Sequence, residues 1–534
     1  MVMKCLIAAW LVLSVLSSAI AGGDVSTRLA AIRAVGDSVC LVTNVVYREA
    51  ADPAGANPLA KWAATAREEA RAVAGGFVRV DFVLKAEPGS DVRCRLELPL
   101  PDGWDGRLWG FGNSGYAGAL PNLQNVVAEG SAAMTTELGT WSVTDCGKSN
   151  GKIWPEPVCR DFAWRATHLM TVYGKRMTAA FYGRKPAKCY FNGGSTGGRQ
   201  AMSEAIRYPD DYDGIIAHLP ANNSAVNELA IWHLWRQTHD ADGKLLFTAE
   251  EMQAVADAAV AFRAKTDPAP YAGSILADAR FTAEEVDGFL ALAAQRTPSL
   301  SEGDKLRRLR AIHLPLVIDG KCWFNGFAPG SYLGKNMTWM GVVNLRAFLR
   351  TKGFGYPRWK DVTPAEIKAF LASPGEDAFN ACSPDLRAFA NRGGRLIMTA
   401  GWEDQTISPL PIVDYYERVC EKDGGIGKTK SYFRLFCVPG CAHGGGRGRA
   451  MTGAPGGEAT RKRLVEWCEN GKPPEAIEGR WIGRMQLPVA AYPGLFVKNA
   501  ADKWERVETR RGVVRIDEVA LGTDAKPEKR GNRR

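Results

Sequence analysis

A serine lies among four glycines in the stretch "FNGGSTGGRQ", residues 191–200. Residues 193–197, "GGSTG", match the G-x-S-x-G pattern of a nucleophile held on a sharp turn between a strand and a helix. A serine hydroxyl attacks a carbonyl group only when a base takes its proton and donors hold the oxyanion. The strand-like "CYFN" precedes the pattern and the helix-like "GRQAMSEAI" follows it. We therefore interpret Ser195 as a nucleophile rather than as part of an ordinary glycine-rich loop.

A serine on such a turn requires an acid and then a histidine, each after a later strand. Of the six histidines, His443 follows a late strand-like run and lies in the loop "VPGCAHGGGRG". A surface histidine would be the ordinary interpretation of that loop, but the serine turn favours His443 as the general base. His168 lies in the helical stretch "RATHLM" and is interpreted as structural.

Two carboxylates are candidates for the acid. The stretch "RLIMTAGWEDQTISP" places Glu403 and Asp404 just after a buried, strand-like run. Either one could orient the imidazole and stabilise its cation. Their position at a strand end argues against ordinary surface acids, but spacing alone does not choose between them.

The elements that must position these residues alternate between strand and helix. Strand-like runs at "FVRVDFVLK", "DVRCRLELPLP", "KCYFNGG" and "GIIAHLPA" are separated by helix-like stretches from about residue 161 onward. Residues 222–382 are helical and loop-rich, and alternation resumes at "RLIMTAG". This order predicts an α/β fold, a mainly parallel sheet with helices on its faces, split by one long insertion.

The ends of the chain predict export. The first 21 residues, "MVMKCLIAAWLVLSVLSSAIA", have the basic start, apolar run and small-residue end of a signal peptide cut after Ala21. The run is short for a membrane-spanning helix, so we expect no stable membrane anchor. The remaining chain divides into a first sheet part (22–221, helix-like to about residue 74), the insertion (222–382), a second sheet part (383–515) and a basic tail (516–534) expected to be disordered.

Charge and cysteine content exclude some functions. The formal net charge of +10 comes partly from the basic tail, and no zinc-finger or helix-turn-helix spacing accompanies it, so we expect no nucleic-acid partner. Few histidines and no CxxC pair argue against a metal site. Eleven of the twelve cysteines remain after signal removal, and the sequence leaves their pairing and redox state open.

Several segments resemble the tannase and feruloyl esterase family, which also includes hydrolases of mono(2-hydroxyethyl) terephthalate. The resemblance runs from about residue 90 to 480 and is carried by "LPDGWDGRLWGFGNSGYAG", "FNGGSTGGRQAMSEAIRYPDDYDGIIAHLPANN", "GWEDQTISPLPIVDYYERV", "RLFCVPGCAHGGG" and "LVEWCENGKPPEAI". It implies an α/β-hydrolase in which residues 222–382 form a lid. It also implies Ser195 as nucleophile, Asp404 as acid and His443 as base, with the backbone N–H groups of Gly115 and Thr196 as the oxyanion hole.

The implied function is a secreted or periplasmic serine carboxylic-ester hydrolase. We expect it to cleave aromatic acyl esters through an acyl-enzyme, feruloyl or coumaroyl esters first and galloyl esters second. Its small-molecule substrate could be free or attached to plant cell-wall polysaccharide. Two alternatives stay open, namely a non-catalytic binding protein on a hydrolase scaffold and a serine peptidase with the same triad. Oligomeric state is not predicted.

Two departures from the family pattern are visible. Family members carry cysteines just before the nucleophile and just after the histidine, where this chain has Gly194 and Gly444, so both partners of that disulfide are missing. The family's calcium loop corresponds to "FRAKTDPAPYAGSILADARF", which has Lys265, Pro268 and Ala272 where carboxylates would be expected. Calcium prefers several hard oxygen ligands, so we expect no calcium and no other cofactor.

Overall fold

A computed structural model describes most of the chain. The described residues are 25–48, 73, 75–115, 120–140, 155–268, 271–334, 365, 379–443, 457–480, 486–509 and 511–517. The predicted signal peptide, Gly444, residues 518–534 of the predicted tail and much of 335–378 lie outside these residues. No helix among the described residues is both long enough and apolar enough to cross a membrane.

The chain divides into two compact units. The first comprises residues 1–144, 155–191 and 211–213, and the second comprises residues 145–154, 192–210 and 214–534. Strand β6 (Lys188–Gly194) begins in the first unit and ends in the second. The predicted boundaries at 221, 382 and 515 are not tested by this division and stay predictions.

The first unit contains an antiparallel run of strands and one parallel pair. Its order is β1-β2-β3-β5-β4, then β6. Pairing is antiparallel from β1 through β3 to β5, and parallel between β5 and β4. The strands are β1 (Cys40–Arg48), β2 (Phe77–Leu84), β3 (Val92–Pro99), β4 (Arg107–Phe111) and β5 (Ala132–Thr136).

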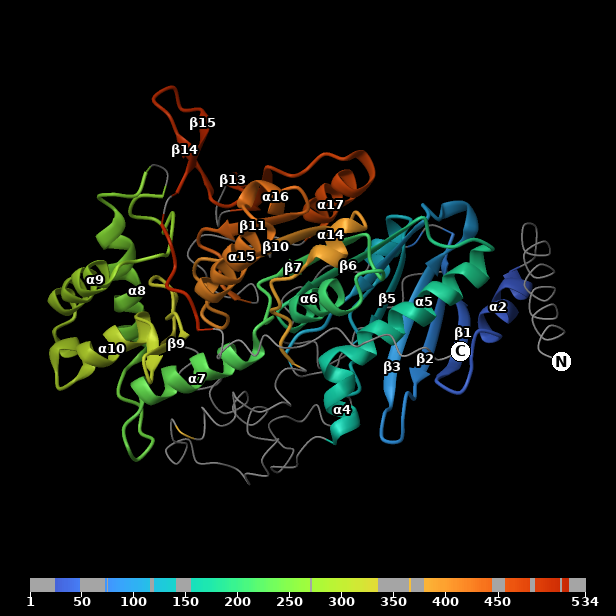
Figure 1. The fold of residues 1–534 in the computed structure, drawn as a ribbon, viewed down its shortest axis with the longest axis horizontal. Coiled ribbons are helices and arrows are strands. Elements are labelled where there is room, and N and C mark those ends of the chain that lie inside the picture. The colour runs from blue at the N-terminus through green and yellow to red at the C-terminus, as the bar shows by residue number, and fades with distance from the viewer. Residues whose placement is uncertain are drawn as a thin grey trace. The chain divides into compact units, whose positions relative to one another are not determined.

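Helix α5 (Ala166–Tyr182) packs against strands β2, β3, β4 and β5 of the first unit (Figure 1). Helix α2 (Val25–Arg33) packs on α5 and β1. The shorter helical elements of this unit are η4 (Pro101–Gly103), α3 (Gln124–Ala128), α4 (Glu156–Arg160) and the π-helical turn η6 (Asp161–Arg165).

The expectation of a helix-like segment from residue 22 to about 74 is wrong for part of its length. Residues 40–48, "CLVTNVVYR", form β1 and pair with β2 along the whole strand. Three valines and a threonine favour this conformation, because β-branched side chains pack well on a pleated sheet surface. Pairing with β2 therefore outweighs the helical character of the residues before it.

The second unit carries the parallel strands that matter for the site. Their order is β6-β7-β10-β11, and the β7–β10 and β10–β11 pairs are parallel. Parallel strands joined through helices are the pattern of the predicted α/β class, which is confirmed. The bounds are β7 (Gly214–His218), β10 (Arg395–Gly401) and β11 (Phe433–Val438).

Helices bury these strands almost completely. Helix α6 (Thr196–Arg207) packs against β7, α17 (Glu458–Asn470) against β7 and β10, and α15 (Pro409–Asp423) against β10. Every residue of β7 is buried, as expected for a parallel strand covered on both faces. Two short helices complete this layer, α14 (Arg387–Asn391) and α16 (Ile426–Thr429).

Residues 222–382 are helical where they are described. Helix α9 packs against α8 and α10, and α10 also packs against α7 (Figure 1). Thr248 and Thr282 cap α8 and α9 in reciprocal capping boxes with Glu251 and Glu285, which fixes where these helices begin. The elements are α7 (Ser224–Thr238), α8 (Ala249–Arg263), α9 (Ala283–Arg296), η7 (Pro298–Ser301), α10 (Lys305–His313), β8 (Leu316–Ile318) and β9 (Lys321–Phe324).

The C-terminal part of the second unit ends in a strap, residues 511–517. The strap follows two hairpins, β12–β13 (Ala476–Arg480 with Gln486–Ala490) and β14–β15 (Gly494–Lys498 with Trp504–Glu508). Arg511 of the strap pairs with Glu285 of α9 at 2.8 Å, and Arg515 pairs with Asp414 of α15 at 3.2 Å. The strap thus joins the inserted helices to the helix that follows the acid-bearing loop.

Candidate active site

Ser195 is held in a strained conformation between β6 and α6. Its backbone has φ 58° and ψ −119°, a combination that residues with a side chain rarely adopt. The Ser195 N–H donates to the carbonyl of His218 (2.9 Å), and the Ser195 carbonyl accepts from Ala221 N–H (3.0 Å). Both bonds anchor the turn to the carboxyl end of β7, so the strain is stabilised by the neighbouring strand.

The glycines around Ser195 allow close backbone contact. A Cβ atom at Gly193 would lie 2.3 Å from the carbonyl oxygen of Gly197. One at Gly198 would lie 2.7 Å from the Cα atom of Pro220. Both distances are far below van der Waals contact, so a residue with a side chain at either position would force the turn apart.

Asp404 lies after β10 and is fully buried. Its Oδ1 atom accepts the backbone N–H groups of Thr406 and Ile407, each at 2.8 Å. Its Oδ2 atom lies 2.8 Å from Nδ1 of His443. The neighbouring Glu403 instead donates its backbone N–H to the carbonyl of Cys441 at 3.1 Å. The structure therefore brings Asp404, rather than the side chain of Glu403, to the imidazole.

His443 joins the acid to the serine. Its Nε2 atom lies 3.0 Å from Ser195 Oγ, and its side chain keeps 15% of its surface exposed. The arrangement that satisfies both contacts has the proton on Nδ1, donated to Asp404, while Nε2 accepts from the serine hydroxyl. All three side chains belong to the second unit. The geometry is that of a nucleophile, a base and an orienting acid.

Burial and the nearby carboxylate act in opposite directions on the imidazole. Burial alone would lower the pKa of His443, because a charged ring is poorly solvated. The charge of Asp404 and its hydrogen bond to Nδ1 more than offset this effect and raise the pKa of His443 above its ordinary value. The imidazolium that forms when Ser195 loses its proton is thus stabilised.

Thr196 and Gly115 are the two predicted oxyanion donors. Thr196 is the first residue of α6, so its N–H has no acceptor within the helix and lies at the positive end of the helix dipole. Gly115 follows β4 in a turn with φ +58°, and a Cβ atom there would meet nothing within 4 Å. Gly115 belongs to the first unit. Their joint role stays a prediction.

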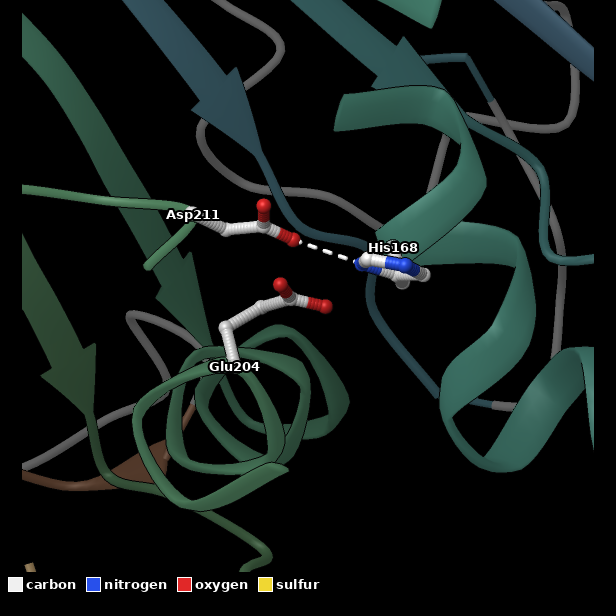
Figure 2. A group of neighbouring side chains, drawn as sticks. All are labelled: His168, Glu204 and Asp211. Atoms are coloured by element: carbon white, nitrogen blue, oxygen red, sulfur yellow. Dashed lines mark hydrogen bonds and ion pairs between the residues drawn. The ribbon is translucent and has the colours of Figure 1, made fainter. Parts of the chain in front are cut away.

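His168 has a carboxylate partner within the first unit. Its Nδ1 atom lies 2.7 Å from Oδ2 of Asp211, and the two side chains point toward each other (Figure 2). Lys175 Nζ also approaches Asp211, at 3.6 Å from Oδ1. Glu204, the third residue drawn, lies on α6 in the second unit. The interpretation of His168 as structural stays a prediction.

Two other histidines are buried among the inserted helices. His313 lies against Phe327, whose carbonyl is 3.0 Å from Nδ1, and burial lowers the pKa of His313 to about 4. Nε2 of His233 lies 2.8 Å from the carbonyl of Ala311, and burial lowers the pKa of His233 as well. Both rings stay neutral at physiological pH. Each lies within hydrogen-bonding distance of a backbone carbonyl, as is common for histidines in a protein core.

Among the described cysteines, Cys40, Cys94, Cys322, Cys420, Cys437 and Cys441 are free thiols. Cys441 is buried two residues before His443, and its burial, followed by the charges of Asp404 and Glu403, raises the pKa of its thiol far above the ordinary value. It therefore stays protonated and packs beside the site instead of competing as a nucleophile. Gly194 stands where family members carry the cysteine before the nucleophile. A Cβ atom there would lie 3.3 Å from Cβ of His218.

One polar residue at the site carried no signal in the sequence patterns. The side chain of Gln405 accepts the backbone N–H of His443 through Oε1 at 3.1 Å. Its position directly after the acid was visible in the sequence, but the contact depends on how the two loops fold together.

Two serines link the acid loop to the insertion. Ser408 Oγ donates to the carbonyl of Gly326 (2.8 Å), and Ser331 Oγ donates to the carbonyl of Asp404 (3.4 Å).

The chain is similar to known proteins in both sequence and structure. A sequence profile of the family described as "Tannase and feruloyl esterase" matches residues 78–270 and 351–492. The chain is 29% identical over 459 residues to a probable feruloyl esterase B-2 of Aspergillus flavus, covering 80% of this chain and 84% of that protein. It is 28% identical over 401 residues to feruloyl esterase B of Aspergillus niger, covering 72% and 76%.

Solved structures share the fold. Feruloyl esterase B from Aspergillus oryzae superimposes with a TM-score of 0.73 at 21% identity, over 90% of this chain and all of that one. Tannin acyl hydrolase from Aspergillus niger gives 0.71 at 16% identity, over 92% and 96%. The predicted α/β-hydrolase fold is therefore confirmed.

The strain at Ser195 predicts different outcomes for two inactive variants. Ser195→Ala and Ser195→Gly should both lower kcat for an ester on the order of 10⁶-fold, because both remove the nucleophile. Only glycine relieves the backbone strain, which should outweigh its own entropy cost, so Ser195→Gly should be about 1 kcal/mol more stable than Ser195→Ala. Urea unfolding of both proteins measures the difference. A less stable glycine variant would contradict a strained turn.

The environment of His443 predicts the pH dependence of turnover. A protonated imidazole cannot accept the serine proton, so kcat/KM should rise with pH as His443 loses its proton. Because the pKa of His443 is raised, the midpoint of this rise should lie above about 6.5. Asp404→Asn removes the charge that raises this pKa, so the midpoint should move to lower pH while kcat falls about 10⁴-fold. A midpoint that Asp404→Asn leaves in place would be inconsistent with this assignment.

Proposed function

Because the chain belongs to the tannase and feruloyl esterase family, and is a carboxylic ester hydrolase, we propose that it cleaves aromatic acyl esters by a serine triad. Ser195 is the nucleophile, His443 the base and Asp404 the acid of this proposal. One observation carries it. Ser195 Oγ lies 3.0 Å from His443 Nε2, whose ring in turn lies 2.8 Å from a fully buried carboxylate.

The reaction proceeds in two displacements. Ser195 Oγ attacks the ester carbonyl while His443 Nε2 takes its proton, giving a tetrahedral oxyanion. The N–H of Thr196, with Gly115 as the second donor that the family resemblance implies, holds this oxyanion. His443 then returns the proton to the alcohol, which leaves. Water attacks the acyl-serine through the same base and releases the carboxylic acid.

Feruloyl and coumaroyl esters are the proposed first substrates, and galloyl esters the second. This order is supported by two relatives that match most of the chain, the probable feruloyl esterase B-2 of Aspergillus flavus and feruloyl esterase B of Aspergillus niger. The substrate is a small aromatic ester, either free or carried on plant cell-wall polysaccharide. Export to the periplasm or medium, with cleavage after Ala21, belongs to the same proposal and rests on the N-terminal sequence pattern.

The aspartates that remain in the family's calcium-loop region fit ion pairs better than a calcium ion. Asp267 Oδ2 accepts the backbone N–H of Ala277 at 3.0 Å, and its Oδ1 lies 3.7 Å from Arg263 Nε. Asp278 forms a buried pair with Arg280 through both of its oxygens. A divalent cation would be repelled by these guanidinium groups. We propose that the loop needs no calcium and that no step of the reaction uses a metal.

A substrate panel tests the proposed function. We expect the purified protein to hydrolyse methyl ferulate and methyl p-coumarate with higher kcat/KM than methyl gallate and p-nitrophenyl acetate. A fluorophosphonate should label the wild type but not Ser195→Ala. A protein that neither cleaves esters nor reacts with the probe would be a binding protein on a hydrolase scaffold. Cleavage of peptides in preference to esters would indicate a peptidase.

Chelation and one substitution test how the loop is held. EDTA should leave Tm unchanged, whereas Arg280→Met should lower the free energy of unfolding by about 3 kcal/mol, since it leaves Asp278 buried without its partner. Arg310→Met is the matched control, because its partner Asp287 is exposed, and it should leave the free energy of unfolding nearly unchanged. A Tm that falls in EDTA and recovers with calcium would overturn the metal-free loop.

A further inference from the structure

Three successive residues of the acid loop contact the histidine loop. Glu403 donates its backbone N–H to the carbonyl of Cys441 (3.1 Å). Oδ2 of Asp404 lies 2.8 Å from Nδ1 of the His443 imidazole. Gln405 then accepts the backbone N–H of His443 (3.1 Å). The first contact needs no particular side chain at residue 403. The second fixes the ring, and the third fixes the backbone from which the ring extends.

The backbone contact adds a constraint that the acid alone does not provide. A carboxylate bonded to Nδ1 fixes one point of the imidazole, but the ring can still tilt about that point if Cα of His443 shifts. Tilting would move Nε2 away from Ser195 Oγ, and a misplacement of about 1 Å can cost on the order of 10²-fold in rate. The bond from His443 N–H to Gln405 Oε1 holds the second point.

The loops are already close enough for a side chain of this length to reach. The ladder of β10 and β11 continues past the strand ends through Trp402 N–H and the carbonyl of Val438, at 3.0 Å. A Cβ atom at Gly401 would lie 2.4 Å from the carbonyl oxygen of Cys441. Gln405 lies directly after Asp404. The Asp404 carboxylate accepts the backbone N–H groups of Thr406 and Ile407, which closes the turn on which Gln405 lies.

We propose that Gln405 is a positioning residue for the triad, acting through the backbone N–H of His443 to keep Nε2 on the serine hydroxyl. This inference rests on the proposed function and deepens it. In this role Gln405 acts through the backbone N–H of His443. Its contribution lies in the acceptor oxygen, so a side chain of equal length without that oxygen should fail, and one that keeps it should succeed.

Two substitutions at this position separate the acceptor from mere packing. Gln405→Met keeps the length and loses the acceptor, so kcat for methyl ferulate should fall between about 10- and 100-fold with KM and Tm little changed. Gln405→Glu keeps the acceptor and should retain kcat within about threefold of wild type at alkaline pH. The carboxylate that it adds near His443 joins Asp404 in favouring the imidazolium, so the acid limb of kcat/KM should move to higher pH.

A control and a second readout make the outcomes distinct. Gln253→Met removes an exposed glutamine contact on α8, to Asp257, and should leave kcat unchanged. The rate of fluorophosphonate labelling should fall with kcat in Gln405→Met. Wild-type kcat in Gln405→Met, or equal losses in both variants at residue 405, would overturn the positioning role. An inactive wild type would instead refute the proposed function, because the role proposed for Gln405 concerns only how kcat of its variants differs from kcat of an active wild type.

Discussion

The site depends on how one buried negative charge is satisfied. A carboxylate taken fully out of water is costly unless donors surround it, and Asp404 has three. Two are backbone N–H groups of its own loop, both on Oδ1, and the third is the imidazole on Oδ2. Because the loop occupies Oδ1, the ring has a single place to bond. That assignment puts the proton on Nδ1 and leaves Nε2 to accept from Ser195.

The serine side of the site is fixed by close packing instead of charge. Ser195 keeps its strained backbone because His218 and Ala221 bond its N–H and its carbonyl. Glycines at 193 and 198 permit the close approach of the backbone segments around this turn. Strand β6 ends directly before this turn, and helix α6 begins directly after it. Strain and burial together place the hydroxyl where the imidazole can reach it.

The sequence predicted the residues that sit at strand ends in strong local patterns. Ser195 and His443 could be identified because a glycine turn and a late strand end limit the possibilities. Asp404 could be chosen over Glu403 only through family resemblance, since the difference lies in which of two adjacent groups faces the histidine loop. Strand β1 was missed because its partner β2 lies some 30 residues further along the chain. Gln405 and the strap, whose Arg515 contacts Asp414, depend on contacts between loops that no local pattern encodes.

The insertion contacts the acid loop through a backbone carbonyl and a serine hydroxyl, and not through the charge of Asp404. Ser331 bonds the carbonyl of Asp404, and Ser408 of the acid loop bonds the carbonyl of Gly326, so neither contact touches the carboxylate. The strap fastens the same insertion to α15, the helix that begins where the acid loop ends. An insertion attached in this way can change its side chains while the charge on Asp404 and the ring of His443 stay in place. The predicted triad residues lie at strand ends with strong local patterns, whereas a shared fold does not determine a substrate, so the choice among aromatic acids could not be predicted in the same way.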